Sequence, residues 1–437
     1  MNESNRQPAL VATLSWILYD FANTIYSMNV VSMYFTTWIV VELALGDHYV
    51  SYANSFSMIL VALTLPILGE ISDRYRRKMP FLLLYTLICI VFTAGIGIAG
   101  YAFSGKMTMV AWAIVFFVIA NYSYQGGLVF YNALLPQVSS EKSIGRVSGY
   151  GVAVGYLGSI VGLLLVRPFV NGHFSGLNIP FLNSGGSVAA FIPTALLFLI
   201  FALPIFFFVK DEPTKSQLSV KRLGIKNSFR KVLDGISNTK KYPGVARFLV
   251  AKFFYEDAIE TVIIFMAVYT QKVMGFSASS TTNFFIVLIP SAIIGSAFFG
   301  IMTDHFGPKR TLMIVLIGWI VCLTALVLTM KAWLFWVLGG LIGIFMGSTW
   351  TSARPLLISL VPKEMLGEFF GLYSLSGKLA AIFGPLVWAG IVSLFSEYGD
   401  VFKYKAAIFS LSLLILIGLL ILNKVPDKKS HSFNKTS

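Results

Sequence analysis

The stretch "GEISDRYRRK", Gly69 to Lys78, decides the fold class when it is set beside "GIMTDHFGPKR", Gly300 to Arg310. Each stretch has a glycine, an aspartate four positions later, a tight turn and then basic residues, and the two glycines lie 231 positions apart. A second echo has a similar offset: Leu135-Pro136 and Val361-Pro362 are each followed by two glycines four positions apart. The chain therefore consists of two halves with the same internal pattern.

The composition places both halves in a membrane. Of 437 residues, 57% are hydrophobic and 12% are charged, whereas a soluble domain carries about 25% charged residues. The apolar runs are long enough to cross a hydrocarbon core, which takes about 20 helical residues, and backbone in lipid has to bond to itself. Twelve helical spans are predicted, at 12–40, 50–71, 79–102, 108–132, 146–169, 188–209, 246–270, 282–303, 311–330, 332–353, 367–395 and 405–423.

Twelve spans in two repeated halves predict an all-α polytopic protein with two pseudo-symmetric six-helix bundles, the major facilitator architecture. We expect an N-terminal bundle at 1–209, a basic cytoplasmic linker at 210–245, a C-terminal bundle at 246–426 and a tail at 427–437. The linker is either a flexible charged tether or carries a short amphipathic helix at 220–236 that lies on the membrane surface.

The net charge of +14 follows the predicted topology. With both termini in the cytoplasm, the cytoplasmic segments hold twenty-four Lys and Arg residues and the opposite side holds six. This bias obeys the positive-inside rule, so we predict a multi-pass plasma-membrane protein, expected to be a monomer, with both termini cytoplasmic. Anionic membrane lipids are the expected partner of the basic surface, and nucleic acid is not.

Other classes of protein find little support in the chain. The polar start and the long first apolar run do not fit a cleavable signal peptide. Cys89 and Cys322 both lie inside apolar runs, so we expect no disulfide framework. No nucleophile–base motif, metal-ligand spacing or Walker glycine loop occurs, which argues against an enzyme, a metal site, a cofactor and ATP use.

The repeated G-x-x-x-D motif predicts a gate. Its glycine permits close helix approach, and its aspartate can face the positive N-terminus of a helix in the other half. A latch of this kind would bias the opening equilibrium, so we assign gating to five residues: Gly69, Asp73, Arg74, Gly300 and Asp304. The fifth predicted span also carries three glycine pairs at spacing four, between residues 145 and 162, which are typical of close helix packing.

Polar residues inside spans are functional candidates because each is costly there, at about 2.5–3.5 kcal/mol for a charge at the bilayer centre. In "LSWILYDFANTIYSMNV", Asp20 lies about 12 Å from the predicted cytoplasmic end. Asn23 and Tyr26 follow it in the same span. The fourth span carries a polar stripe with an adjacent tyrosine: Asn121, Gln125, Tyr131 and Asn132.

The seventh span, "AKFFYEDAIETVIIF", is the most heavily charged, with Lys252, Glu256 and Glu260 on one stripe and Asp257 beside them. Lys252 is near the cytoplasmic end and could snorkel toward water, whereas Glu256 and Glu260 are too deep and too short to do so easily. Cationic residues follow in the later spans at Arg354 and Lys378.

Three roles are open for these charges. Arg354 or Lys378 could pair with an acid and fix helix packing. A crowded acid could take up a proton, because burial and like charge favour its neutral form. The charges could also bind a charged or zwitterionic solute directly. A cation site is the remaining alternative, although no ligand-rich spacing argues for it.

Several stretches resemble the vacuole-effluxer family of the major facilitator superfamily and its bacterial relatives. They are "WILYDFAN" in the first span, "FYNALLPQV" after the fourth, "GYGVAVGYLGSIVG" in the fifth, "KFFYEDAIET" in the seventh and "VPKEMLGEFFGLYSLSGKLAAIFGP" into the eleventh. The chain departs from the family pattern at Asp257-Ala258, where a glycine usually follows the aspartate, and before Arg354, where a glutamine is common. The resemblance implies export of small solutes, with amino acids the class attached to vacuolar members.

We therefore predict a proton-linked secondary transporter that moves a small polar or zwitterionic, amino-acid-like solute outward by alternating access. A lipid or lysolipid flippase and a multidrug/proton antiporter on the same fold are the alternatives. The multidrug signature, a glycine-proline pair in the fifth span, is absent, although "FGP" occurs at Phe383–Pro385. A sensor would normally add a soluble domain. The predicted coupling acids are Asp20, Glu256, Asp257 and Glu260, and the predicted substrate-binding residues are Asn23, Tyr26, Asn121, Gln125, Tyr131, Asn132, Tyr255, Trp350, Arg354 and Lys378.

Overall fold

The structure is a computed structural model that describes residues 9–45, 48–75, 77–174, 177–178, 184–211 and 242–427. It separates into two compact units. Unit 1 holds Met1–Ser140 and Val154–Val220, and unit 2 holds Glu141–Ala153 and Lys221–Ser437. The thirteen residues 141–153, which sequence alone places in the first half, thus pack with unit 2. The predicted linker helix at 220–236 lies outside the described residues.

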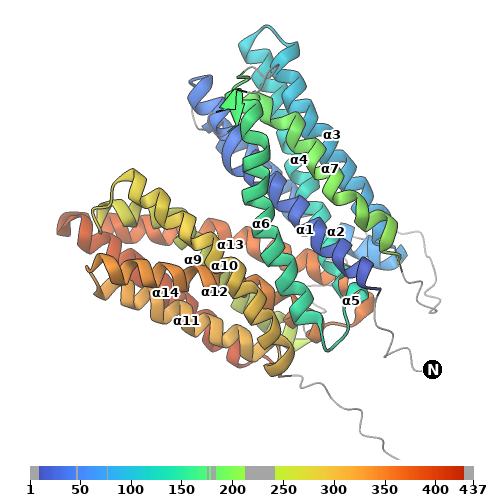
Figure 1. The fold of residues 1–437 in the computed structure, drawn as a ribbon. Helices are drawn as coiled ribbons and strands as arrows, with labels where there is room; N and C mark the ends of the chain where they lie inside the picture. Colours follow the sequence, from blue (N-terminus) through green and yellow to red (C-terminus); the bar gives the residue numbers. More distant parts are fainter. Residues whose placement is uncertain are drawn as a thin grey trace, which may run out of the picture. The chain divides into compact units, whose positions relative to one another are not determined.

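Unit 1 is built from long helices (Figure 1). Between them lie short elements: η4 (Ser187–Ala190), α5 (Leu135–Val138) and a two-residue antiparallel pair, β1 (His173–Phe174) with β2 (Leu177–Asn178). This small pair is the exception to the predicted all-α class. The long elements are α1 (Leu10–Tyr26) continued by η2 (Ser27–Tyr34) and η3 (Thr37–Glu42), α2 (His48–Tyr75), α3 (Met79–Ala102), α4 (Lys106–Ala133), α7 (Phe191–Phe208) and, from Val154 onward, α6 (Ile144–Asn171).

Unit 2 repeats this plan. Its short elements are η5 (Lys363–Met365) and η6 (Ser396–Tyr398). Its long helices are α9 (Pro243–Lys272), α10 (Ala278–Phe306), α11 (Pro308–Leu328), α12 (Ala332–Leu360), α13 (Leu366–Leu394) and α14 (Gly399–Asn423). In the described part of the chain, each of the twelve predicted spans coincides with one long helical segment, and eight of these are long and apolar enough by composition to cross a membrane.

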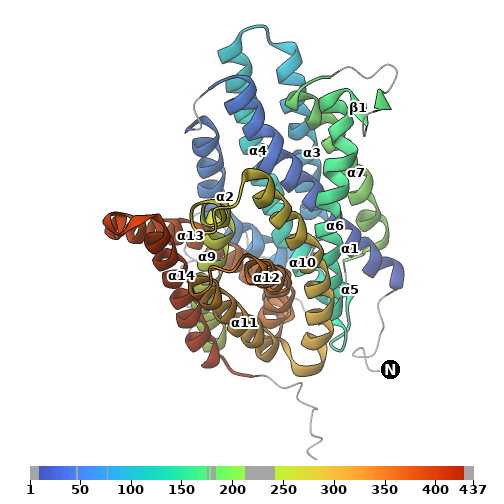
Figure 2. The same ribbon diagram turned by 60° about the vertical axis from the view of Figure 1, so that its left-hand side comes forward.

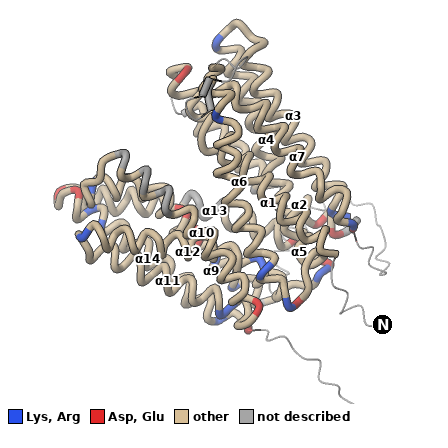
Figure 3. Tube along the Cα trace, in the orientation of Figure 1, with Lys and Arg blue, Asp and Glu red and all other residues tan. Residues whose placement is uncertain are grey.

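Local chemistry sets the helix ends. Prolines stand in the first turn of α3, α9 and α11, where the missing N–H costs nothing. Gly307 separates α10 from α11 with φ +86°, a backbone conformation that favours glycine. Most charged residues lie at helix ends and in loops, and the helix interiors are largely uncharged (Figure 3).

Within each unit the helices pack in close pairs. In unit 1, α3 lies beside α4 in both views (Figures 1 and 2), and α1 packs on α7. In unit 2, α10 packs on α12, and α9 packs on both α13 and α14. Helix α9 therefore packs against two neighbours within unit 2, and Lys252 and Glu256 of its charged stripe are buried.

The first span is unusual in its backbone. After Tyr26 it continues as π-helix through Ser27–Tyr34 and again through Thr37–Glu42. π-Helical turns are rare in proteins, and those that occur are often at functional sites. Asn29 lies in this segment with no exposed surface, and neither polar atom of its carboxamide has a hydrogen-bond partner in the described chain.

Candidate functional site

The centre of the candidate site in unit 2 is an ion pair between Lys252 and Glu256 on α9. Both residues are buried, with 1% and 5% of their surface exposed. The Lys252 Nζ also lies 4.0 Å from the ring centroid of Tyr373 on α13. Trp350 on α12 donates its indole N–H to the second carboxylate oxygen of Glu256 at 3.2 Å. The pair is therefore held by three helices of the same unit.

This geometry corrects the prediction that Lys252 snorkels. Its position one helical turn before Glu256 lets the two side chains bond along α9, and burial removes the competing water. A buried charge with one paired partner is stable, whereas removing that partner costs about 3–5 kcal/mol. Lys252 is thus the cation that neutralises Glu256.

A second polar contact between α9 and α13 lies at Gly384. Its backbone N–H donates to the Oδ1 atom of Asp257 at 2.6 Å. Asp257 has no exposed surface. A Cβ at position 384 would lie 2.8 Å from that oxygen, so only glycine fits. Gly377 of α13 packs equally closely on the Lys252–Glu256 pair, because a Cβ at Gly377 would lie 2.8 Å from Glu256 and 2.9 Å from Lys252.

The remaining predicted residues of unit 2 lie on the same helices. Glu260 and Arg354 are half-buried. Tyr255 is buried, and its hydroxyl has no hydrogen-bond partner among the described residues. The side chain of Lys378 lies outside the described part, so its predicted role stays a prediction.

In unit 1 the predicted residues of the first span are all buried. Asp20 is 5% exposed and Asn23 is 2% exposed. The ring of Tyr26 lies 4.9 Å from that of Tyr124 on α4. The Tyr26 hydroxyl contacts the buried Cys89 thiol of α3, whereas the Asn23 amide nitrogen has no hydrogen-bond partner in the described chain. Unpaired buried polar atoms are costly, so this nitrogen is a candidate for contact with water or a solute.

The predicted stripe of α4 divides into different environments. Asn121 donates to Asn54 at 3.1 Å and to Ser57 at 2.8 Å, both on α2. Tyr131 stacks on Trp16 at 4.4 Å and also on Tyr19.

Two further residues complete that stripe. Gln125 is half-buried, and Asn132 is 7% exposed with a side-chain carbonyl oxygen that has no hydrogen-bond partner among the residues the structure describes. The structure therefore brings Asn23 and Tyr26 into one buried surface of α1, whereas Asn121 and Tyr131 are held by packing within unit 1.

The glycine pairs of the fifth span do pack a helix, and α6 uses different pairs in each unit. In unit 1, a Cβ at Gly158 would lie 2.6 Å from the hydroxyl oxygen of Thr24, and one at Gly162 would lie 3.0 Å from Ile25. Thr24 also donates to the carbonyl of Gly155. Helix α6 thus lies directly against α1 along these glycines.

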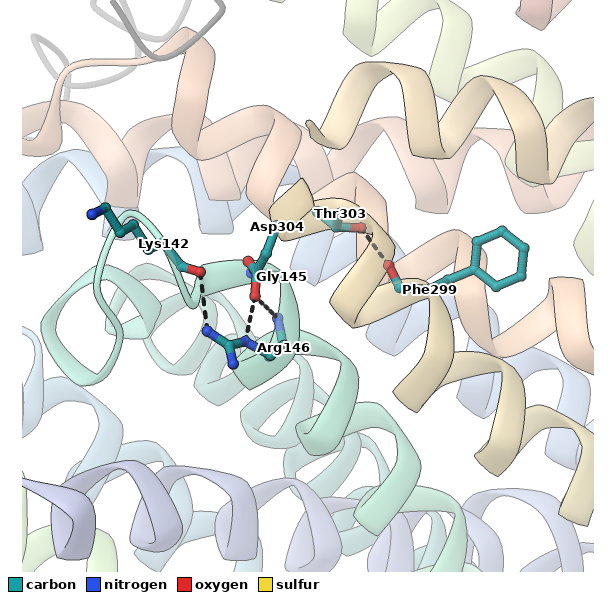
Figure 4. A network of polar contacts seen from close by, with 6 residues as sticks. All are labelled: Lys142, Gly145, Arg146, Phe299, Thr303 and Asp304. Atoms are coloured by element: carbon teal, nitrogen blue, oxygen red, sulfur yellow. Dashed lines mark hydrogen bonds and ion pairs between the residues drawn. The ribbon is translucent and has the colours of Figure 1, made fainter. Parts of the chain in front are cut away.

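In unit 2, the first turns of α6 lie against α10 at the second G-x-x-x-D motif (Figure 4). A Cβ at Gly145 would lie 2.6 Å from the carbonyl oxygen of Gly300. Asp304 accepts from the backbone N–H of Gly145 at 2.6 Å and from that of Arg146 at 3.1 Å. Its carboxylate also pairs with the Arg146 guanidinium at 2.8 Å. The aspartate therefore binds the positive end of a helix.

The first copy of the motif has different contacts within unit 1. Asp73 lies 3.8 Å from the Nζ atom of Lys78, and the carbonyl of Gly69 accepts from Ser72 at 3.0 Å. The Arg74 side chain lies outside the described part. Asp211, which follows α7, accepts the backbone N–H groups of Lys78 and Met79 at 2.9 and 3.1 Å. It caps α3, a role that its place in the charged linker did not reveal.

Several residues of these sites escaped prediction from sequence. Tyr373, Thr261 and Asn29 are ordinary residues of apolar spans when read alone. Gly377 and Gly384 carry a usable signal, because both lie on α13 seven positions apart, which places them on one helical face. Across the described residues, no group of three or more His, Cys, Asp or Glu side chains is placed to hold a metal ion.

The chain is similar in sequence to known proteins. Residues 46–432 match the family described as "Vacuole effluxer Atg22 like". The chain belongs to this family. An uncharacterised transporter of the major facilitator type from Bacillus subtilis, YxiO, is 30% identical over 95% of both chains. A multidrug resistance efflux pump PmrA homologue from Lactococcus lactis is 24% identical over 85% of this chain and 84% of its own.

The fold is also similar to that of solved structures. The crystal structure of a bacterial homologue of the iron transporter ferroportin, in an outward-facing state, superposes with a TM-score of 0.70 over 95% of this chain and 98% of that one, at 13% identity. By its family and its similarity to YxiO, this Atg22-like protein is a multi-pass membrane transporter of the major facilitator superfamily rather than an enzyme.

Proposed function

We propose that this Atg22-like transporter couples proton movement to the export of a small zwitterionic, amino-acid-like solute by alternating access. The observation that carries the proposal is the buried Lys252–Glu256 pair with its Trp350 and Tyr373 contacts. An ion pair inside a membrane-spanning bundle is expensive to maintain. Such a pair is a candidate for function because a proton or a solute carrying both charges can replace either partner.

The acids and the cations have separate roles in this proposal. Glu256 and Glu260 lie one turn apart on α9. Two ionised carboxylates so close together in a low-dielectric region repel each other, so both should not stay ionised at once. We assign them, with Asp20 and Asp257, to proton coupling. Asn23, Tyr26, Tyr255, Trp350 and Arg354 remain the proposed solute contacts, together with Asn121, Gln125, Tyr131, Asn132 and Lys378 from sequence. The Asp304–Gly145 contact and Asp73 are the proposed gates.

Proteoliposome transport tests the coupling. With a pH gradient as the only driving force, we expect Glu256→Gln and Glu260→Gln to lose gradient-driven transport. Glu364→Gln is the matched control, because Glu364 lies on η5 with an exposed side chain. Full gradient-driven transport by both α9 variants would show that neither acid is the coupling site.

Two alternatives keep specific support. The similarity to an efflux pump homologue favours a multidrug/proton antiporter. A lipid flippase is favoured by an open apolar hollow of about 490 Å³ in unit 1, lined by Tyr52, Phe56 and Ile59 of α2 and Val118 of α4, among others. Thermal stability of the purified protein against amino acids, cationic dyes and lysolipids distinguishes the three, since a ligand bound only by the folded state raises apparent stability.

A further inference from the structure

Near the contact at Gly384, two buried oxygen atoms of α9 have no hydrogen-bond partner among the described residues. They are the Oδ2 atom of Asp257 and the Oγ1 atom of Thr261, and neither residue has any exposed surface. The two residues are four positions apart in one helix, so they share a face. A threonine hydroxyl in a helix commonly donates to the carbonyl four residues earlier, as Thr270 does to Met266 at 2.7 Å. Thr261 makes no such bond.

Both residues lie close to Gly384. A Cβ at Gly384 would lie under 3.0 Å from the Thr261 hydroxyl oxygen, from the Asp257 backbone carbonyl oxygen and from the Asp257 Oδ1 atom, which belongs to the same carboxylate as the unpartnered Oδ2. Pro385 follows Gly384 within α13. Because proline has no N–H, the α13 carbonyl four residues before it loses its helical donor. The place where α9 meets α13 is therefore rich in oxygen atoms with spare lone pairs.

Among the described side chains, none balances the charge at this place. A buried carboxylate requires a positive partner or neutralisation, and in the described chain Asp257 forms no ion pair. The nearest lysine along α9, Lys252, is bonded to Glu256. Asp257 accepts a hydrogen bond from the backbone N–H of Gly384. That bond leaves its second oxygen to be satisfied.

We propose that Asp257 and Thr261, beside Gly384, form a binding site for one dehydrated Na⁺ ion. Carboxylate, hydroxyl and carbonyl oxygens are the ligands of hard cations. A single carboxylate neutralises a single positive charge, so a monovalent ion leaves the buried site neutral, whereas a divalent ion does not. The site adds Na⁺ at Asp257 as a coupling ion of the proposed transporter. This coupling role of Na⁺ rests on the proposed function.

Binding of radioactive Na⁺ to the purified full-length protein tests this site at constant pH and without a gradient. We expect saturable binding of about one ion per chain and a thermal midpoint that rises with NaCl but not with choline chloride. Thr261→Val should weaken binding at least tenfold, and Thr261→Ser should retain it. Thr270→Val is the control, since it removes an equally buried hydroxyl of α9 that has its own acceptor.

Absence of saturable Na⁺ binding to the wild-type protein would overturn the proposal, as would wild-type affinity in Thr261→Val or an equal loss in Thr270→Val. Asp257→Asn should abolish binding, and if that variant does not fold, Thr261→Val decides. The binding measurement needs no transport, so a wild-type protein that binds Na⁺ but shows no proton-driven uptake refutes the proposed function and leaves this site intact.

Discussion

The Oδ1 atom of Asp304 lies 2.6 Å from the backbone nitrogen of Gly145, in the first turn of α6. The first N–H groups of a helix have no partner within it, and a carboxylate placed there is stabilised by the helix dipole. The side chain of Asp304 is 4% exposed, whereas that of Arg146 is 47% exposed. The Gly145 contact is therefore the shielded part of the network, and the Arg146 ion pair is its solvated edge.

Asp304→Asn should destabilise the protein by about 1–3 kcal/mol, because it removes a charge-assisted bond and leaves buried amides poorly satisfied. Arg146→Gln should cost about 0–1 kcal/mol, since exposed ion pairs contribute little. Thermal unfolding in detergent measures both. If the gate is real, Asp304→Asn also changes the transport rate while solute binding is largely retained. Equal destabilisation by the two variants would contradict this division.

Gly145→Ala tests the close approach of α6 and α10. The new Cβ would lie 2.6 Å from a carbonyl oxygen of Gly300 and from Thr303, so we expect a loss of about 1–3 kcal/mol through overpacking. Gly390→Ala is the control, because a Cβ there meets nothing within 4 Å. In a helix interior that change should stabilise by up to about 1 kcal/mol. Similar thermal midpoints for the two variants would disprove the close contact.

The buried pair in α9 predicts strong coupling between two substitutions. Lys252→Met alone leaves Glu256 buried without its cation and should cost about 3–5 kcal/mol. Adding Glu256→Gln should recover part of that loss, because the uncompensated charge is removed. A double-mutant cycle on thermal unfolding gives the coupling energy. Additive effects would show that the two side chains do not depend on each other.

Asp211→Ala should weaken the start of α3. Its carboxylate binds two backbone N–H groups there, and loss of such a cap costs about 0.5–2 kcal/mol. Asp427→Ala is the comparison, since Asp427 pairs at 3.1 Å with the exposed Arg310 side chain and should change stability by about 0–1 kcal/mol. Hydrogen exchange of the α3 amides locates the effect. Unchanged exchange in Asp211→Ala would rule out the cap.

Pattern alone was sufficient for the fold class. The repeated motifs at Gly69 and Gly300 and the apolar runs predict two six-helix halves, because a helix in lipid is dictated locally by length and hydropathy. The same local logic named α9 as the charged helix. It was wrong about Lys252, since snorkelling depends on whether water or a neighbouring helix surrounds the side chain, and no local pattern carries that information.

By itself the sequence determined the fold class, the approximate positions of the long helices, and which polar residues lie inside apolar spans. Only the tertiary structure decided which polar groups meet: Lys252 with Glu256, Asp257 with Gly384, Asp304 with Gly145. Helix formation follows from backbone bonds between near neighbours in the chain. Pairing between helices depends on which faces touch, and here glycines set the closest contacts because only they leave room for a side chain from the next helix.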